Sequence, residues 1–180
     1  MSPGDVESQR APAGPRDERV AGGAEPEDDA HWMGLALAQA RLARDADEVP
    51  VGAVVVLDGR VIGSGHNQTR GGMDPTAHAE MVAITAAART VQANRLVGST
   101  IYTTVEPCFM CAGALLHARV SRVVWGVRDE KFGGCVSLGQ VLSDPRLNHR
   151  ATITEGVCAN QARELLQTFF RGKRSAPPRV

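Results

Sequence analysis

Short apolar segments of strand length alternate along this chain with longer segments whose apolar residues recur at helical spacing. The valine-rich residues 51–57 are a continuous apolar run, which is typical of a strand buried on both faces. Asp58 and Gly59 then give a two-residue hairpin signal, and residues 60–65 return as the antiparallel partner. Residues 99–105 and 121–126 indicate two further interior strands.

Two helices are predicted on either side of this hairpin. Residues 29–47 have an amphipathic pattern. The apolar residues at helical spacing, which we expect to face the core, are Leu35, Ala38, Leu42 and Ala46. After a loop over residues 66–76, a second helix with Thr76 as its expected N-cap carries His78 in its first turn and is apolar around most of its circumference.

Two more helices follow the later strands. A short apolar helix begins with Cys108, and residues 159–171 form a last amphipathic helix. The inner face of that last helix is predicted to carry Ala162, Leu165, Leu166 and Phe169. Residues 128–150 have weak periodicity, so we expect mostly loop, with a short helix at 138–142. Right-handed crossovers make the later strands parallel neighbours, which predicts an α/β fold: a three-layer α-β-α sandwich with a mixed central sheet, antiparallel hairpin first, then parallel strands.

The amino-acid composition adds little to the prediction of the fold, but it bears on which partners the protein could bind. Twenty basic and twenty acidic residues balance in a chain of 180, a length that suits one domain with a substantial core. The first 29 residues hold eight acids and three arginines, so the remainder is net basic and a nucleic-acid partner is compatible with the neutral total. Because no apolar run could span a bilayer and the start lacks a signal peptide's apolar region, we expect a cytoplasmic protein that does not bind membranes.

The ends of the chain differ from its centre. Residues 1–28 are rich in proline, glycine and charge and contain no aromatic residue, which predicts a disordered tail. Residues 29–174 are expected to form the folded domain, and residues 175–180 a flexible end.

The candidate chemistry lies in two short segments, His78-Ala79-Glu80 and Pro107-Cys108-Phe109-Met110-Cys111. Two cysteines three positions apart at the start of a helix point the same way, so their thiolates can bind one divalent ion, with His78 as a third ligand. Three protein ligands leave the fourth tetrahedral position of zinc open, which is typical of a catalytic site. Glu80 is then available as a general acid and base that does not bind the metal.

A closed structural zinc site is the alternative. Its fourth ligand would come from Cys135, Cys158 or another histidine. In a reducing compartment we expect Cys135 and Cys158 to be free thiols.

The paired motifs H-x-E and P-C-x-x-C are those of the zinc-dependent base deaminases, and the chain resembles the bacterial tRNA adenosine deaminases. The resemblance covers residues 29–174, so it identifies that range as a zinc deaminase domain. The matching segments, in order, are VPVGAV (49–54), GSGHN (63–67), DPTAHAE (74–80), EPCFMCAGA (106–114), LNHR (147–150) and FFRGKR (169–174).

This resemblance implies a cytidine deaminase-like fold, a homodimer and one zinc ion per subunit. It also implies hydrolytic deamination of the wobble adenosine to inosine in a tRNA anticodon loop, that of tRNA-Arg. Glu80 is assigned the proton transfers: it accepts the proton of the attacking water, passes it to N1 of adenine and later protonates the leaving nitrogen.

The substrate contacts are also expectations. The resemblance implies that Asn67 contacts the target base, with Ala79 beside it, and that Asp129 contacts the neighbouring nucleotide. The adjacent rings of Phe169 and Phe170 cannot both face the core, so we expect Phe170 to meet a base and the basic residues after it to meet phosphate. Those basic residues are Arg171, Lys173 and Arg174.

Simpler interpretations of these residues remain open. Asn67 could be a turn asparagine that satisfies backbone groups, Asp129 a solvated loop residue, and the basic end a solvated helix terminus, with Gly172 ending the helix early. For the whole protein, the rival functions are a deaminase of free bases or nucleosides and a noncatalytic RNA-binding module with structural zinc.

Overall fold

A computed structural model of the chain describes residues 26–175. Its elements are α1 (Pro26–Asp45), β1 (Gly52–Leu57), β2 (Arg60–His66), α2 (Ala79–Val91), β3 (Thr100–Val105), α3 (Phe109–His117), β4 (Arg122–Val127), β5 (Thr152–Glu155) and α4 (Ala159–Ser175). Because α1 begins at Pro26, the fold starts slightly before the predicted position. The tail predicted over residues 1–28 lies, up to residue 25, outside the described residues, as does the end after residue 175.

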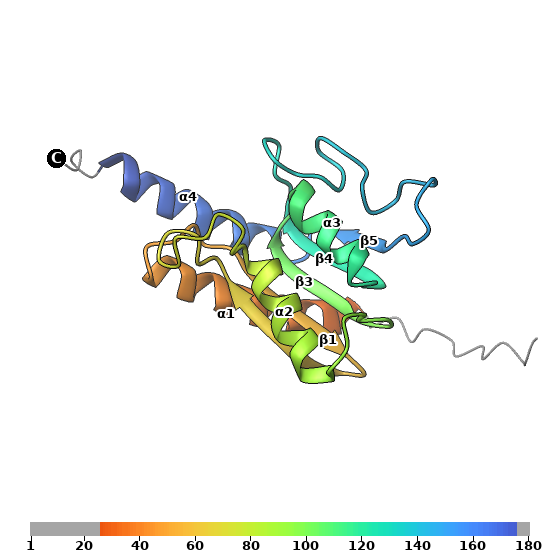
Figure 1. The fold of residues 1–180 in the computed structure, drawn as a ribbon. Helices are drawn as coiled ribbons and strands as arrows, with labels where there is room; N and C mark the ends of the chain where they lie inside the picture. The colour runs from red at the N-terminus through yellow and green to blue at the C-terminus, as the bar shows by residue number, and fades with distance from the viewer. Residues whose placement is uncertain (1–25, 176–180) are drawn as a thin grey trace, which may run out of the picture.

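The five strands form one mixed sheet in the order β2-β1-β3-β4-β5. β1 pairs antiparallel with β2 and with β3, whereas β3, β4 and β5 run parallel. One core cluster lies between the sheet and helices α2 and α3, and a second lies between the opposite face and helices α1 and α4 (Figure 1). The three-layer α/β prediction is confirmed.

The opening hairpin forms where the sequence predicts it. Asp58 and Gly59 both have positive φ, at 49° and 69°, which matches the twist that a two-residue hairpin turn requires. Val54 faces the α1 side and Val55 faces the α2 side, and both are buried, as expected of a strand covered on two faces.

The predicted inner face of α1 is wrong. Leu35 and Leu42 are 38% and 50% exposed, and the side that faces the sheet consists of Met33, Ala36, Leu37, Ala40 and Ala43. The reason is close packing: Gly52 of β1 lies so near α1 that an added Cβ would overlap the Ala36 carbonyl oxygen. Alanines therefore face the sheet where Gly52 approaches, and Leu35 and Leu42 lie on the opposite side of the helix.

Three further expectations need correction. The short helix expected at 138–142 does not form: residues 138–140 are irregular, and a turn begins at residue 141. β5, which was not predicted, forms from half-exposed and exposed residues at the edge of the sheet, where burial gives no apolar pattern to detect. Gly172 does not end the last helix, because α4 continues to Ser175.

Candidate active site and metal centre

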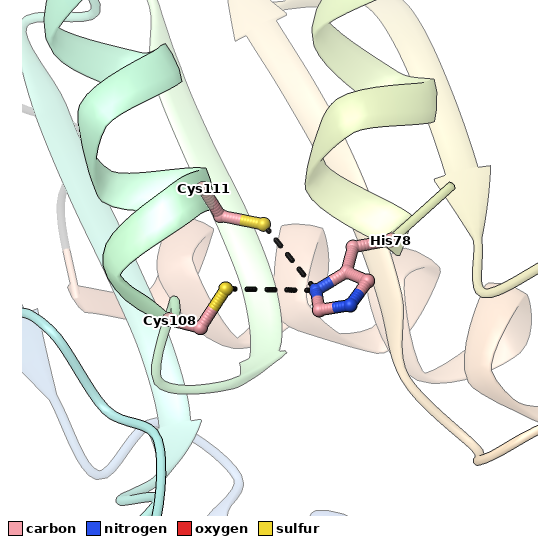
Figure 2. A group of neighbouring side chains, drawn as sticks. All are labelled: His78, Cys108 and Cys111. Atoms are coloured by element: carbon pink, nitrogen blue, oxygen red, sulfur yellow. Dashed lines mark hydrogen bonds between the residues drawn. The ribbon is translucent and has the colours of Figure 1, made fainter. Parts of the chain in front are cut away.

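The ends of two helices on the same face of the sheet bring three metal-binding side chains together. His78 is the N-cap of α2, Cys108 is the N-cap of α3, and Cys111 lies in the first turn of α3. The expected N-cap, Thr76, is therefore wrong by two residues: its hydroxyl instead donates to Asp74. Figure 2 shows the His78 ring opposite the two cysteines, with one ring nitrogen, Nδ1, facing both sulfur atoms.

The spacing of these donors fits a zinc ion. His78 Nδ1 lies 3.6 Å from Cys108 Sγ and 3.5 Å from Cys111 Sγ, and the ligand atoms all lie within 4.8 Å of one another. Tetrahedral zinc with ordinary Zn–S and Zn–N bond lengths separates a sulfur from a nitrogen ligand by about 3.6 Å. The donor set and its geometry therefore suit one zinc ion with three protein ligands.

No fourth protein ligand joins this group among the described residues. Cys135 is buried, and its thiol faces the Pro107 carbonyl oxygen at 3.5 Å, while Cys158 lies with the other core cluster. Both are free thiols, as expected. Residues 26–175 thus do not form a closed structural zinc site with either cysteine as its fourth ligand.

The two ligand cysteines differ in proton affinity before metal binds. A hydrogen bond from Cys111 and the proximity of His78 outweigh burial and lower the pKa of Cys108 to about 4. The pKa of Cys111 is raised, because its proton is held by Cys108 and its thiol is buried. Metal binding must therefore displace the proton of Cys111.

Glu80 lies beside this group without belonging to it. Its side chain is buried, and Oε2 has no hydrogen-bond partner among the described residues. Burial, which disfavours the charged form, raises the pKa of Glu80 to about 7. His78 and Glu80 are two residues apart and reach the same site because His78 precedes the first helical residue.

These residues open onto a cavity of about 1100 Å³. Among the residues that line it are His78, Cys108 and Glu80, together with three of the predicted substrate contacts, Asn67, Asp129 and Phe170. The cavity lies at the carboxyl ends of β3 and β4, where parallel sheets usually bind ligands.

Asn67 and Ala79 are joined to each other. The Asn67 side-chain oxygen accepts the Ala79 backbone N–H at 2.9 Å, which satisfies one of the free donors at the start of α2. Ala79 itself is fully buried. The Asn67 side chain thus has a structural bond and also lines the cavity.

Asp129 organises its own loop at the cavity rim. Its Oδ1 accepts the backbone N–H groups of Lys131 at 3.0 Å and of Phe132 at 3.2 Å. Lys131 and Phe132 line the same cavity.

Of the predicted RNA-binding residues at the end of α4, only Phe170 lines the cavity. Phe170 is 43% exposed and lines the cavity, and Phe169, half-buried, packs against it edge to face. The ammonium of Lys173 lies over the Phe169 ring and forms an ion pair with Asp47. Arg171 and Arg174 are exposed and do not line the cavity.

Sequence reasoning missed several cavity residues. Arg163 and Gln167 precede Phe170 by seven and three positions, so helical spacing from Phe170 could have found them. Glu106 also lines the cavity, and its position between a buried strand and the Pro107-Cys108 pair was an available signal. Thr69 and Lys131 lie on loops, whose distance from the metal ligands the sequence does not give.

The chain is similar in sequence to known zinc-dependent deaminases. Residues 26–127 match the family described as the cytidine and deoxycytidylate deaminase zinc-binding region. The chain is 44% identical over 144 residues to a tRNA-specific adenosine deaminase of Agrobacterium fabrum, covering 80% of this chain and 95% of that protein. It is also 44% identical over 147 residues to a tRNA-specific adenosine deaminase of Haemophilus influenzae, covering 81% and 85%.

A solved structure has the same fold. It comes from work on A-to-I editing by tRNA:A34 deaminases at the wobble position of transfer RNA, with a TM-score of 0.73 and 43% identity. The match covers 76% of this chain and 99% of that one. No helix among the described residues is long and apolar enough to cross a membrane.

Proposed function

This chain belongs to the zinc-binding cytidine and deoxycytidylate deaminase family, and on that premise we propose that it hydrolyses the wobble adenosine of a tRNA anticodon loop to inosine, releasing ammonia. The observation that carries this proposal is the three-ligand group beside a buried, unligated Glu80 at the base of a large cavity. The relatives named tRNA-specific adenosine deaminases, at 44% identity, support the RNA substrate.

His78, Cys108 and Cys111 would hold one zinc ion. When bound there, zinc would supply a Lewis acid that makes water a better nucleophile. The start of α2 and the start of α3 both direct the positive ends of their helix dipoles at this group, which favours the thiolate forms of the cysteines.

Glu80 would handle the protons. Its carboxyl group is buried and has an unpaired Oε2 among the described residues, so it can accept a proton there and return it. It would accept the first proton of the attacking water and deliver it to N1 of adenine, which makes C6 electrophilic. It would then accept the second proton, from the hydroxyl group now on C6, and pass it to the leaving nitrogen, which departs as ammonia. Burial keeps solvent from this oxygen, so the proton stays within the site.

The cavity rim would bind the nucleotides. Asn67 lies beside the metal ligands, where the target base would enter, with the buried Ala79 behind it. Asp129 lies on the loop where a neighbouring nucleotide would pass. Phe170 offers a ring to a splayed base. Arg171, Lys173 and Arg174 extend from the rim along α4 and would contact phosphates farther from the target.

Inosine formation on defined RNAs tests the function. Zinc-loaded protein is incubated with anticodon stem-loops that carry adenosine at the wobble position, with matched stem-loops that carry it one position away, and with free adenosine. We expect inosine only in the first set. Deamination of free nucleosides but not of stem-loops would favour the free-base alternative, and zinc binding without deamination would favour the noncatalytic alternative.

We further propose a cytoplasmic homodimer, with residues 29–174 as its deaminase domain. The exposed Phe109 at the start of α3 and the half-buried apolar residues beside it favour an interface on the α2–α3 side. Light scattering with size-exclusion chromatography tests the assembly; a monomer at micromolar concentration would reject it.

A further inference from the structure

Glu106 is a buried carboxylate that the proposed proton transfers do not use. It directly follows β3, stands two residues before Cys108 and is 2% exposed. Its Oε1 accepts the backbone N–H groups of Cys135, Val136 and Ser137 at 3.2, 2.7 and 2.9 Å. Its Oε2 accepts the Asp129 N–H at 3.1 Å and the Ser137 hydroxyl. All five donors belong to one loop.

That loop has no regular secondary structure to hold it. Residues 128–151 connect β4 to β5 through turns and one isolated bridge, between Gly133 and Cys108. Ordering so long an irregular segment is costly in conformational entropy, so its backbone donors need fixed acceptors. Glu106 supplies the acceptor for four of those N–H groups.

The approach of the loop to Glu106 is unusually close. An added Cβ at Gly133 would overlap the Glu106 carboxyl carbon, so only glycine fits at that position. The Gly134 N–H also donates to the Pro107 carbonyl at 2.9 Å. The loop is therefore attached to the residues immediately before the metal ligand Cys108.

The same loop forms part of the cavity rim. Asp129, Lys131 and Phe132, which we call the rim segment, all line the cavity. The Asp129 N–H is held by Glu106, and the Asp129 carboxylate in turn holds the N–H groups of Lys131 and Phe132. Two successive hydrogen bonds thus connect Glu106 to the whole rim segment.

We propose that Glu106 is a positioning residue that fixes the rim segment relative to the metal-ligand end of the cavity, and so sets how tightly the RNA beside the target base is held. This inference rests on the proposed function. Glu106 acts through the rim segment rather than on the reacting atoms. Its loss therefore weakens RNA binding and raises KM, with much less effect on kcat.

The Glu106→Gln variant tests this in the full-length, zinc-loaded protein. The amide group cannot accept the N–H groups that one carboxylate oxygen accepts, although size is conserved. We expect unchanged zinc content, with both KM and the Kd for a wobble-adenosine stem-loop raised about tenfold, the loss expected for bonds to a charged acceptor. Glu164→Gln makes the same chemical change at an exposed position of α4 and should alter neither value.

A double-variant cycle separates positioning from stability alone. If Glu106 works through the rim segment, Glu106→Gln combined with Asp129→Asn should raise KM no further than the stronger single variant. A lower melting temperature with unchanged KM and Kd in the folded, zinc-loaded Glu106→Gln protein would overturn the inference, as would fully additive effects of the two changes.

Ser137→Ala provides a milder test if Glu106→Gln does not fold. It removes only the hydroxyl donor to Oε2 and should raise KM by a smaller factor in the same direction. An unchanged KM would reject the positioning role while leaving the proposed function intact. A wild-type protein that forms no inosine on any stem-loop would instead reject the proposed function, and this inference with it.

Discussion

Glu80 differs from the other acids around the cavity because one of its oxygens is buried without a hydrogen-bond partner among the described residues. A buried, unpaired carboxylate oxygen costs free energy, and such groups are retained where they have a chemical task. Its raised pKa and its place beside the three ligands give it a task that its neighbours lack.

Replacing Glu80 should therefore separate metal binding from turnover. We expect Glu80→Ala to keep its zinc and to lose about 10²- to 10⁴-fold in kcat, the usual contribution of a general acid and base. Metal analysis and single-turnover kinetics measure the two effects. Glu164→Ala on α4 is the matched control, and substantial activity in zinc-loaded Glu80→Ala protein would refute the proton-transfer role.

The metal ligands were predictable from sequence because their signal is local. Two cysteines three positions apart meet on any helix start, and a histidine two positions before a glutamate completes a recognisable pair. Thr69 and Lys131 were not predictable as cavity residues, because they lie on loops and their position depends on how those loops pack on the sheet. Lys173 shows the same limit: its ion pair with Asp47 joins residues 126 positions apart.

At the scale of elements, helix α2 depends on glycines in β2. An added Cβ at Gly63 would overlap the Ala83 carbonyl oxygen and lie 2.5 Å from the Ala87 backbone nitrogen. An added Cβ at Gly65 would overlap the backbone of α2 in the same way, one turn closer to His78. These glycines let α2 lie directly on the hairpin, which places His78 and Glu80 beside the start of α3.

Gly63→Ala should push α2 off the sheet. We expect a loss of about 3 kcal/mol in the free energy of unfolding, the upper part of the range for overpacked cores, with weaker zinc binding. The control is Gly34→Ala on α1, where nothing lies within 4 Å of an added Cβ and alanine should stabilise the helix by about 0.5–1 kcal/mol. Urea unfolding of both variants checks this; equal stabilities would contradict the packing argument.

Glu48 connects the end of α1 to the loop that follows β2. Burial alone would raise the pKa of its carboxyl group, but hydrogen bonds from the Gly71 and Arg70 N–H groups and the Thr69 hydroxyl outweigh it and lower the pKa below 4.5. The folded state therefore prefers the ionised form more than the unfolded state does. This contribution to stability is full above the unfolded pKa and is lost as the pH falls through the folded value.

Glu48→Gln should remove the contribution that the ionised Glu48 carboxylate makes to the free energy of unfolding. We expect the wild-type protein to be more stable than the variant at pH 7, with the difference shrinking as the pH falls below about 4.5. Urea unfolding at a series of pH values measures it, with Glu164→Gln as the exposed control. A stability difference that is constant from pH 7 to pH 3 would show that the ionised carboxylate is not responsible.

The helices and strands were predictable where neighbouring residues alone determine them. They were not predictable where they depend on packing between elements. Asp58 and Gly59 determine the hairpin turn, and the run of valines in β1 indicates a strand that is buried on both faces. In α1, alanines occur on both sides of the helix, so the pattern could not tell that Ala36 and Ala40 face the sheet while Leu35 and Leu42 do not. β5 forms because β4 offers it a parallel edge, which is a property of the assembled sheet.

Across the whole molecule, one buried ion pair joins the start of the fold to its centre. Asp29 on α1 accepts two hydrogen bonds from Arg122 of β4, at 2.8 and 2.7 Å, and one from the Tyr102 hydroxyl of β3 at 2.9 Å. Arg122 also donates to Thr154 of β5. The Asp29 carboxylate thus ties α1 directly to β3 and β4, and Arg122 extends the connection to β5.

A protein that begins at residue 26 should keep its stability and its deaminase activity, whereas Asp29→Ala in that protein should lose about 2–4 kcal/mol. The loss arises because the Arg122 guanidinium would be left poorly paired in a largely buried place. Asp45→Ala, which breaks an exposed pair with Arg44, should change stability by less than about 0.5 kcal/mol. Thermal and urea unfolding compare the shortened protein and its two variants with the full-length chain. A loss of activity on shortening alone would assign a role to residues 1–25.

The distribution of the metal ligands has a thermodynamic consequence as well. His78 and Cys108 are 30 positions apart and belong to different helices, so an ion bound to both is a crosslink between two strand–helix units. Because the site is assembled only in the folded chain, the free energy of binding the ion to the native state adds to the free energy of unfolding. The zinc ion would then both serve catalysis and join the two helices. Its removal should therefore destabilise the α2–α3 layer before the rest of the sheet.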